Sequence, residues 1–259
     1  MAEELLYDDQ HIAFLEHIWG DGFLSPGGPE EVRRVLSGVE VAGRKVLDIG
    51  CGSGACATLI AGDFSAAHVI GIDVEEPVCT AARAKAEKTG LADRITIHKV
   101  SPGPLPFPEE TFDVVFSKDS IIHIPDKAFM AREAFRVLTP GGRFAASDWL
   151  ISHDGTPSQE MADYIAAEAL DFAMSSPESY RQAMEEAGFT EVELVNRNPW
   201  YSDVAVKELE WLTGPERAAL EKRHGEDFIA EQIDIWKKLV TVLKSGEHCP
   251  HHIRGRKPA

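Results

Sequence analysis

Residues 46–54 read Val-Leu-Asp-Ile-Gly-Cys-Gly-Ser-Gly and carry the strongest fold signal in the chain. An apolar run that ends in an acid is followed by a glycine-dense turn and then by a helix-forming segment, 55–61. This order predicts a buried parallel strand, a tight loop and the N-terminus of a helix. Glycine at positions 50, 52 and 54 removes the Cβ atoms where the backbone must turn sharply or approach a ligand. We therefore expect a nucleoside-bearing cofactor over the carboxyl end of this strand.

The glycine pattern alone is compatible with two classes of cofactor. Gly50-x-Gly52-x-x-Ala55 satisfies the relaxed dinucleotide pattern, in which alanine can replace the third glycine. Asp48, placed before the glycines, instead resembles the first motif of class I S-adenosylmethionine-dependent methyltransferases. A second acid, Asp73, ends the apolar run 69–72 at about the spacing at which a carboxylate reaches the ribose hydroxyls of an adenosine. That acid suits both cofactors.

Composition narrows the class of protein and its partners. The 259 residues are 44% hydrophobic, which suits one large α/β domain with a decorated edge or a small cap. A formal net charge of −17, with no block of Lys and Arg, makes nucleic acid an unexpected partner. The acidic residues 1–10 lack the apolar core of a secretory signal, and no window reaches the roughly 18 apolar residues of a membrane span. Four cysteines without CxxC spacing indicate a reduced, cytoplasmic protein.

Strand and helix signals alternate along the first 150 residues. Five strands are expected at 45–49, 68–72, 95–98, 112–116 and 142–147, with helices at 76–88 and 127–138 between them. This alternation predicts a parallel, doubly wound sheet. Further on we expect helices at 159–170 and 177–187, a strand at 191–195, a long polar helical region over about 204–243 and a last strand at 251–256. Such a late strand can insert antiparallel near the edge.

The stretch after the fourth strand and the stretch before the fifth strand distinguish between the two cofactors. The fourth strand runs into Ser117-Lys-Asp-Ser-Ile-Ile-His123, and Thr139-Pro-Gly-Gly142 leads into the fifth. Together, residues 44–150 resemble class I methyltransferases, whereas a nicotinamide enzyme would need more chain for its substrate domain. The segments Glu16–Gly28, Ser117–His123 and Ser147–Trp149, together with Tyr7, resemble the phosphoethanolamine N-methyltransferase family and related small-amine N-methyltransferases. The similarity covers nearly the whole chain and weakens after about residue 200.

This resemblance implies the architecture. The expected fold is a Rossmann-like, doubly wound, mostly parallel seven-stranded α/β sheet. It carries an N-terminal helical lid over residues 1–40. The methyltransferase domain then covers 41–259, with a helical insertion at about 200–245 before the last strand.

The resemblance also assigns the cofactor, S-adenosyl-L-methionine, to matching positions. It implies that Ser25 contacts the carboxylate end of the cofactor, that Asp48, Gly50 and Gly52 line its methionine portion, and that Asp73 and Val74 line its ribose and adenine. Lys118 stands where the family often has arginine, so a cofactor contact is expected there too. Ser101 occupies the position of a family acid that binds the adenine amine, and a hydroxyl is a weaker discriminator there.

The same resemblance implies that Tyr7 and His123 are the catalytic pair and that Asp119 faces the substrate amine. Methyl transfer from a sulfonium is an in-line displacement, which gains most from alignment and from the exclusion of water. An amine that is protonated at neutral pH must first lose a proton, and histidine, with an ordinary pKa of about 6.5, suits the base. Tyr7 would hydrogen-bond His123 and close the pocket.

Several positions depart from the phosphoethanolamine pattern. Tyr164 matches a phosphate-binding tyrosine, but Glu168 stands at an arginine, Leu170 at another tyrosine, and Trp149 replaces a tyrosine after the fifth strand. A carboxylate beside a phosphate is unfavourable, so we expect a substrate without phosphate, such as a cationic amine.

Three other readings concern the C-terminal third of the chain. Arg254 lies near a family lysine that serves phosphate; it would hold an anion there or merely belong to a basic tail. The tail His248-Cys-Pro-His-His252 has side chains that suit zinc, but it is short and lacks a distant partner pair, so no metal is expected. The aromatic residues Trp200, Tyr201 and Trp211 are expected to pack the helical insertion.

The expected activity is therefore methyl transfer to a small acceptor, most simply an amine nitrogen without phosphate. The alternative methyl acceptors are phosphoethanolamine itself and an oxygen or carbon nucleophile of a small secondary metabolite. A regulator that binds the cofactor without turnover is a further alternative, against which Tyr7, His123 and Asp119 argue. We expect a small-molecule substrate and a monomer or homodimer.

Overall fold

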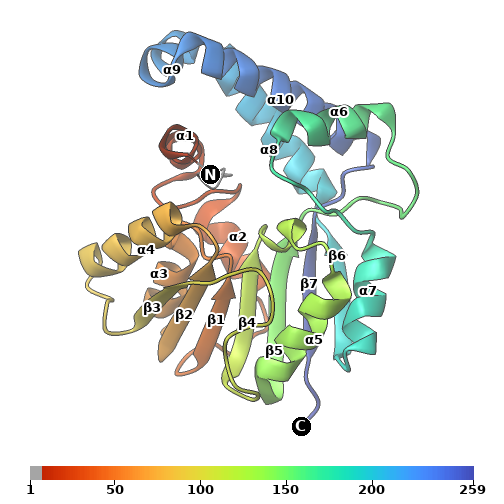
Figure 1. The fold of residues 1–259 in the computed structure, drawn as a ribbon. Coiled ribbons are helices and arrows are strands. Elements are labelled where there is room, and N and C mark those ends of the chain that lie inside the picture. The colour runs from red at the N-terminus through yellow and green to blue at the C-terminus, as the bar shows by residue number, and fades with distance from the viewer. Residues whose placement is uncertain (1–7) are drawn as a thin grey trace.

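The computed structural model describes residues 8–259. Figure 1 shows a central sheet flanked by helices on both faces, with a group of helices above one end of the sheet. In chain order the elements are α1 (Asp9–Trp19), α2 (Gly28–Val35), β1 (Lys45–Ile49), α3 (Ala55–Gly62), β2 (His68–Asp73), α4 (Glu76–Lys88), β3 (Ile95–Lys99), β4 (Phe112–Lys118), the 3₁₀ turn η1 (Ile121–His123), α5 (Lys127–Val137), β5 (Leu138–Asp148), α6 (Gln159–Glu168), α7 (Pro177–Glu186), β6 (Thr190–Asn196), α8 (Asn198–Thr213), α9 (Arg217–His224), α10 (Glu226–Ser245) and β7 (His251–Arg256).

The sheet has seven strands in the order β3-β2-β1-β4-β5-β7-β6. Strands β1 to β5 pair in parallel, and β7 runs antiparallel between β5 and β6. The predicted doubly wound, mostly parallel sheet is therefore confirmed, as is the insertion of the last strand in the opposite direction.

Alternate residues of the buried strands supply two apolar layers. On one face, Val46 and its neighbours pack against α2, α3 and α4; on the other, Leu47 and its neighbours pack against α5 and α7. Both residues are fully buried, as expected for a parallel strand that is covered on both faces.

A third apolar cluster lies outside these two layers. It joins α1 and α6 to the helices between β6 and β7, and it includes Phe14, Tyr164, Tyr201 and Trp236. In Figure 1 these helices lie together above one end of the sheet. We call this group of helices (α1, α6, α8, α9 and α10) the cap.

The region predicted to be polar and helical over about 204–243 is helical, but it is not polar throughout. It forms three helices, α8, α9 and α10, which are interrupted near Gly214 and at Gly225. Gly225 adopts φ 98°, a conformation that favours glycine, so it ends α9 and starts α10. α10 buries nine residues against the cap. Within the described residues, no helix combines the length and the hydropathy that a membrane span needs.

Candidate active site

The glycine loop after β1 is shaped by contacts that leave no room for side chains. Gly50 has φ 70°, and a Cβ atom on it would lie 1.7 Å from Oγ of Ser120. The backbone amides of Gly50 and Cys51 both donate to the carbonyl of Ile72, at 2.9 and 3.0 Å. These contacts hold the loop against the end of β2 and against Ser120, which follows β4, and they require glycine at position 50.

Asp73 ties the glycine loop to the end of β2. Its Oδ2 accepts from the amide of Gly52 at 3.0 Å, and its Oδ1 accepts from the amides of Val74 at 2.8 Å and Glu75 at 3.2 Å. Burial raises the pKa of Asp73, and these backbone donors oppose that rise. Val74 beside it is 44% exposed, a large apolar side chain left open at the strand end.

Asp48 is the buried acid under the same loop. Its side chain is 1% exposed, and Oδ2 has no hydrogen-bond partner within the described residues. Burial and the neighbouring charge of Asp73 raise the pKa of Asp48 to about 8. A buried carboxyl oxygen without a donor is costly, and a cationic ligand group would relieve that cost. The residues present therefore fit a cofactor that carries positive charge and an adenosine, as S-adenosyl-L-methionine does.

The remaining predicted cofactor residues lie at the neighbouring strand ends. Lys118, the last residue of β4, donates from Nζ to Ser25 Oγ at 2.5 Å and to the carbonyl of Pro26 at 2.8 Å. The segment between α1 and α2 is thus fastened to the sheet beside the glycine loop. Ser101 is exposed on the loop after β3, and the amide of Val100 donates to the carbonyl of Asp73 at 2.8 Å.

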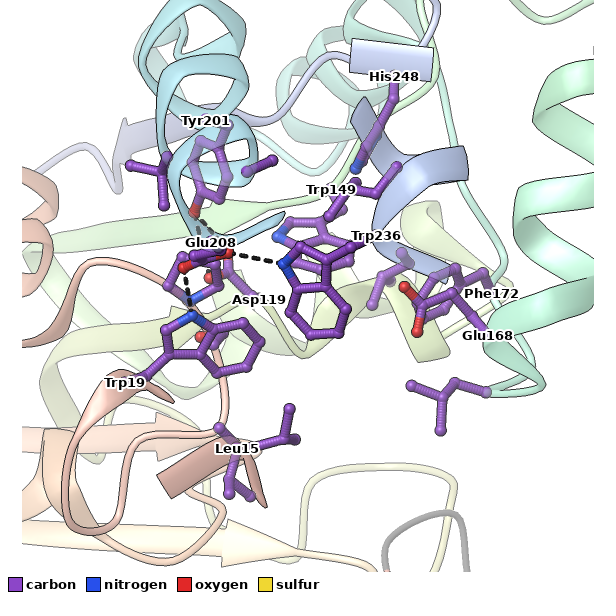
Figure 2. A pocket seen from close by; sticks show the side chains of 18 of the residues that line it. Leu15, Trp19, Asp119, Trp149, Glu168, Phe172, Tyr201, Glu208, Trp236 and His248 are labelled. Atoms are coloured by element: carbon purple, nitrogen blue, oxygen red, sulfur yellow. Dashed lines mark hydrogen bonds between the residues drawn. The ribbon is translucent and has the colours of Figure 1, made fainter. Parts of the chain in front are cut away.

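A pocket lies between the carboxyl ends of β4 and β5 and the cap. Figure 2 shows its walls. Four predicted substrate and catalytic residues line it, Asp119, His123, Trp149 and Glu168, and so does the predicted cofactor residue Ser25. The full lining is His11, Leu15, Trp19, Leu24, Ser25, Pro26, Asp119, Ile122, His123, Trp149, Glu168, Leu170, Phe172, Tyr201, Val204, Ala205, Glu208, Trp236, Leu239, Leu243 and His248.

Asp119 is held by several donors at once. Its Oδ1 accepts from Ser147 Oγ at 2.7 Å and its Oδ2 accepts from Lys118 Nζ at 2.8 Å. The hydroxyl of Tyr201 lies 3.2 Å from Oδ2. Asp119 adopts φ 54°, a strained conformation for a residue with a side chain, and this directs the carboxylate into the space between β4, β5 and α8.

His123 sits at the end of the 3₁₀ turn η1 and its ring contacts Phe172, with centroids 5.6 Å apart. Burial lowers the pKa of His123, so the ring is neutral near pH 7 and able to accept a proton. Its Nδ1 atom is buried and has no hydrogen-bond partner among residues 8–259. Tyr7, the expected partner of His123, lies outside the described residues.

Two buried ionisable side chains fix the turn that carries His123. Lys127 donates from Nζ to the carbonyls of Ile121, Ile124 and Ala173, at 2.8, 2.6 and 2.9 Å. Asp148, at the end of β5, accepts from the amide of Ile122 at 2.8 Å. The turn is therefore anchored to the sheet on one side and to the segment after α6 on the other.

The end of the pocket near α6 is acidic and aromatic. Burial raises the pKa of Glu168 to about 7, while the nearby Tyr164 hydroxyl acts in the opposite direction. Tyr164 is fully buried and its ring lies 5.7 Å from that of His248, between centroids. His248 Nδ1 is 3.1 Å from the carbonyl of Leu150, which can only accept, so Nδ1 donates. Burial lowers the pKa of His248 to about 4, which leaves Nε2 with a lone pair.

Two predicted substrate residues do not line the pocket as described: Tyr164 is fully buried beside it, and Arg254 lies away from it. Its guanidinium donates to the carbonyls of Arg34 and Val35, at 2.6 and 3.0 Å, and to Glu193 Oε2 at 2.9 Å. Residue 254 pairs with Ala145 across β5, well inside the sheet rather than at its carboxyl end. The basic-tail interpretation is therefore the one that fits these contacts.

The histidines of the C-terminal tail also have other partners than a metal. His251 Nδ1 lies 2.6 Å from the carbonyl of Cys249, and His252 Nε2 lies 2.7 Å from Oε1 of Glu31. In the described part of the chain, no three His, Cys, Asp or Glu side chains are grouped so that they could hold a metal ion.

Sequence reasoning missed part of the pocket wall. Tyr201, assigned above to packing, contacts Asp119, and His248 was considered only as a metal ligand. Trp19, Glu208 and Trp236 were not singled out at all. Their helices meet only in the tertiary structure of the cap, so no local sequence pattern identifies these residues as pocket residues. Glu208 is a partial exception, because it lies at helical spacing on the face of α8 that buries Tyr201, Ala205 and Leu212.

The chain resembles proteins of known activity over most of its length. It is 31% identical over 246 residues to phosphoethanolamine N-methyltransferase 1 of Arabidopsis thaliana, covering 95% of this chain and 49% of that protein. It is 32% identical over 251 residues to phosphoethanolamine N-methyltransferase 1 of Triticum aestivum, covering 95% and 48%. The chain thus spans about half the length of these curated relatives.

A solved structure shares the fold. Haemonchus contortus phosphoethanolamine N-methyltransferase 2, in complex with phosphomonomethylethanolamine and S-adenosylhomocysteine, superimposes with a TM-score of 0.89 at 25% identity, covering 98% of this chain and 59% of that one. Residues 40–199 match the family described as "Methyltransferase domain". The methyltransferase resemblance stated from the sequence is confirmed, and the chain belongs to the methyltransferase domain family.

Proposed function

We propose that this protein transfers a methyl group from S-adenosyl-L-methionine to the nitrogen of a small amine that lacks a phosphate. The observation that carries this proposal is the chemistry of the pocket. Its walls present Asp119, Glu168 and Glu208, and no lysine or arginine occurs among the described residues that line it. Burial raises the pKa of Glu168 to about 7 and raises that of Glu208, and Lys118 already pairs with Asp119. A bound cation would favour the ionised form of these carboxyl groups, whereas a phosphate would disfavour it and would find no basic partner in the lining.

Eight residues would hold the cofactor: Ser25, Asp48, Gly50, Gly52, Asp73, Val74, Ser101 and Lys118. When bound, S-adenosyl-L-methionine supplies a methyl group that is activated by the positive sulfur. Asp48 would face its positive charge, Asp73 its ribose hydroxyls, and exposed Val74 its adenine. Lys118 would keep the Ser25 segment closed over the site.

The chemical step needs an amine with a free lone pair. His123 would remove one proton from the ammonium group, because its lowered pKa keeps the ring neutral near pH 7. The deprotonated nitrogen would then have the lone pair that accepts the methyl group, and the electron pair of the broken carbon–sulfur bond would remain on sulfur. Tyr7 would pair with His123, and residues 1–40 would act as a lid that excludes water. Trp149 and Glu168 would line the acceptor side, with the buried Tyr164 hydroxyl beside Glu168.

The second candidate is phosphoethanolamine N-methylation, which the names of the relatives favour. Arg254 offers this candidate no support, since its guanidinium is engaged by two carbonyls and Glu193.

The proposal extends to organisation and partners. Residues 41–259 would form the catalytic domain, with the insertion at about 200–245 completing the pocket. We further propose a small-molecule substrate without nucleic acid or membrane partners, and a monomer or homodimer. All four cysteines are free, which is compatible with the cytoplasm.

Incubation with methyl-labelled S-adenosyl-L-methionine and a panel of acceptors tests the activity. The panel should contain small amines without phosphate, phosphoethanolamine, a phenol and a carbon nucleophile. We expect label in the amines without phosphate. Label in phosphoethanolamine alone would favour the second candidate, and label in none of them, despite binding of S-adenosylhomocysteine, would favour a regulator. Thermal stabilisation by NAD but not by S-adenosylhomocysteine would contradict the cofactor assignment.

A further inference from the structure

A buried ion pair outside the pocket joins α2 to the start of α8. Glu31 on α2 is 1% exposed, and its two carboxylate oxygens accept from Nε and Nη2 of Arg197, at 3.0 and 2.9 Å. His252 Nε2 lies 2.7 Å from Oε1 of Glu31, and it donates because a carboxylate can only accept. Burial raises the pKa of Glu31, but the hydrogen bonds from His252 and Arg197 outweigh burial and lower it to about 2. Glu31 is therefore an ionised carboxylate at neutral pH, held by three donors.

Stability alone does not account for such a pair. The cost of removing two charges from water offsets most of their attraction, so apolar side chains of similar volume often stabilise a fold as well. Two parallel N–H···O bonds between a guanidinium and a carboxylate do fix the relative orientation of the elements that carry them. Here these elements are α2 and α8, and α8 contributes Tyr201 and Glu208 to the pocket lining.

The α2 end of this connection leads to the cofactor site. In the segment between α1 and α2 (residues 20–27), Cδ1 of Leu24 lies 3.2 Å from the position of a Cβ atom added to Gly52. The segment therefore lies against the glycine loop, over which the cofactor is expected. The amide of Glu31 donates to the carbonyl of Gly27 at 3.2 Å, so Glu31 stands one helical turn from the end of this segment. The positions of the segment and of Glu31 are thus fixed together.

The α8 end of the connection leads to Asp119. The amide of Tyr201 donates to the carbonyl of Arg197 at 3.0 Å within the first turn of α8. The hydroxyl of Tyr201 lies 3.2 Å from Oδ2 of Asp119 and is directed toward it in Figure 2. The contacts that hold Arg197 in place therefore also hold the tyrosine hydroxyl at the acid of the pocket.

Trp200 adds a second contact between the same elements. Its ring centroid lies 5.0 Å from Cζ of Arg197, and its Cη2 atom lies 2.7 Å from the position of a Cβ atom added to Gly27. Gly27 has φ 94°, so glycine serves both the turn and this close approach. The segment between α1 and α2, the ion pair and the first turn of α8 therefore form one packed unit.

We propose that Glu31 and Arg197 are positioning residues, which couple closure of the segment between α1 and α2 over the cofactor to the placement of Tyr201 against Asp119. Neither side chain lines the pocket within the described residues, so both act on the acceptor only through Tyr201. The acceptor pocket is then complete only when the cofactor site is closed, and the amine binds best after the cofactor. This inference rests on the proposed function, in which Asp119 faces the amine.

Hydrogen exchange with S-adenosylhomocysteine as the only ligand tests the coupling without turnover. In the wild type we expect binding to slow exchange at least about fivefold, both in the glycine loop and in residues 200–206 of α8. Arg197→Gln removes the two parallel bonds, so the protection of α8 should be lost while that of the glycine loop remains. Protection of the loop alone in the wild type, or unchanged protection of α8 in Arg197→Gln, would overturn the inference.

Kinetics with the amine that accepts label locate the effect on the acceptor. Arg197→Gln should raise the KM of the amine at least about tenfold while kcat falls less than about threefold. Arg197→Lys, which keeps the charge but not the two parallel bonds, should give an intermediate KM. Tyr201→Phe leaves the ion pair intact and should raise KM by itself, and adding Arg197→Gln to it should raise KM no further. An additive rise would overturn the inference, because the pair would then act by another route.

Arg254→Gln is the matched control. The guanidinium of Arg254 also fastens α2, through the carbonyls of Arg34 and Val35, but its third partner, Glu193, belongs to β6 rather than to α8. This substitution should lower the melting temperature and leave the KM of the amine within about twofold of the wild type. A rise in KM equal to that of Arg197→Gln would assign the effect to a loosened α2 and overturn the inference.

The outcomes separate this inference from the proposed function. Transfer of label to an amine, without protection of α8 by S-adenosylhomocysteine, would support the function and overturn the coupling. Protection of α8 that depends on Arg197, without label in any amine, would support the coupling and contradict the function.

Discussion

Nζ of Lys118 lies 2.8 Å from Oδ2 of Asp119, its neighbour in the chain, and the two side chains are 3% and 1% exposed. The same ammonium group donates to Ser25 and Pro26. One buried cation therefore neutralises the acid at the end of β4 and fastens the segment between α1 and α2. We therefore propose that closure of the cofactor site and the charge of the pocket are coupled through this residue.

Lys118→Met should weaken both functions of that cation. Removal of one partner of a buried ion pair costs about 3–5 kcal/mol of unfolding free energy, and the Ser25 segment loses its anchor. We expect a lower melting temperature and at least tenfold weaker binding of S-adenosylhomocysteine in calorimetric titration. Arg33→Met is the control, because it removes an exposed ion pair with Asp63 and should cost less than about 1 kcal/mol. Equal effects of the two substitutions would contradict the coupling.

Gly50→Ala should disrupt the glycine loop by direct overlap. The new Cβ atom would lie 1.7 Å from Oγ and 2.3 Å from Cβ of Ser120, so rotation of the serine cannot relieve the clash. Gly43→Ala is the matched control. Gly43 has a φ of 72°, close to the 70° of Gly50, but no atom lies within 4 Å of a Cβ added to it. Both variants suffer the strain of positive φ, about 1 kcal/mol. Only Gly50→Ala should also lose affinity for S-adenosylhomocysteine; a similar loss in Gly43→Ala would assign the effect to backbone strain.

The raised pKa of Asp48 predicts how the free energy of unfolding depends on pH in the absence of ligand. The pKa of Asp48 is about 8 in the folded protein, whereas the ordinary value of 3.8 applies to the unfolded chain. Between these two pH values the folded state therefore holds a proton that the unfolded state has lost. The contribution of Asp48 to stability is full below about pH 4 and is lost as the pH rises toward 8. Asp48→Asn, which stays neutral, should therefore raise the melting temperature relative to the wild type more at pH 8.5 than at pH 5. An equal shift at both pH values, measured by thermal unfolding, would contradict the raised pKa.

The fold was predictable where local signals bound each element. β1 and α4 have the predicted bounds, because a glycine turn ends the first and an acid followed by proline starts the second. The cofactor side of the site follows from the same signals, since its residues stand at strand ends. The part of the pocket that Trp19, Trp236 and Glu208 line was not predictable in this way. It exists only where α1 meets α8 and α10, which follow it by more than 180 positions in the sequence. Single side chains on helices give no sign of which pocket they will line.

His123→Ala should separate turnover from cofactor binding. A positioned base contributes about 10²–10⁴-fold to rate, and His123 is not one of the residues proposed to hold the cofactor; its ring packs against Phe172. We expect kcat to fall at least 100-fold while the affinity for S-adenosylhomocysteine changes less than about threefold. His153→Ala is the control, because His153 is a largely exposed histidine paired with Glu247. Equal losses of turnover and binding in His123→Ala would reject the assignment as base.

Lys127 is expected to act through His123 rather than on the substrate. Its Nζ donates to three carbonyls, two of which belong to the segment around His123 and one to Ala173. In Lys127→Met those carbonyls lose their donor, so the turn loosens and kcat should fall by about tenfold, less than in His123→Ala. Because a displaced turn matters to rate only while the imidazole is present, the double variant should be no slower than His123→Ala alone. Additive losses in this double-mutant cycle would mean that Lys127 affects turnover by another route, such as the buried Asp148 that its charge accompanies.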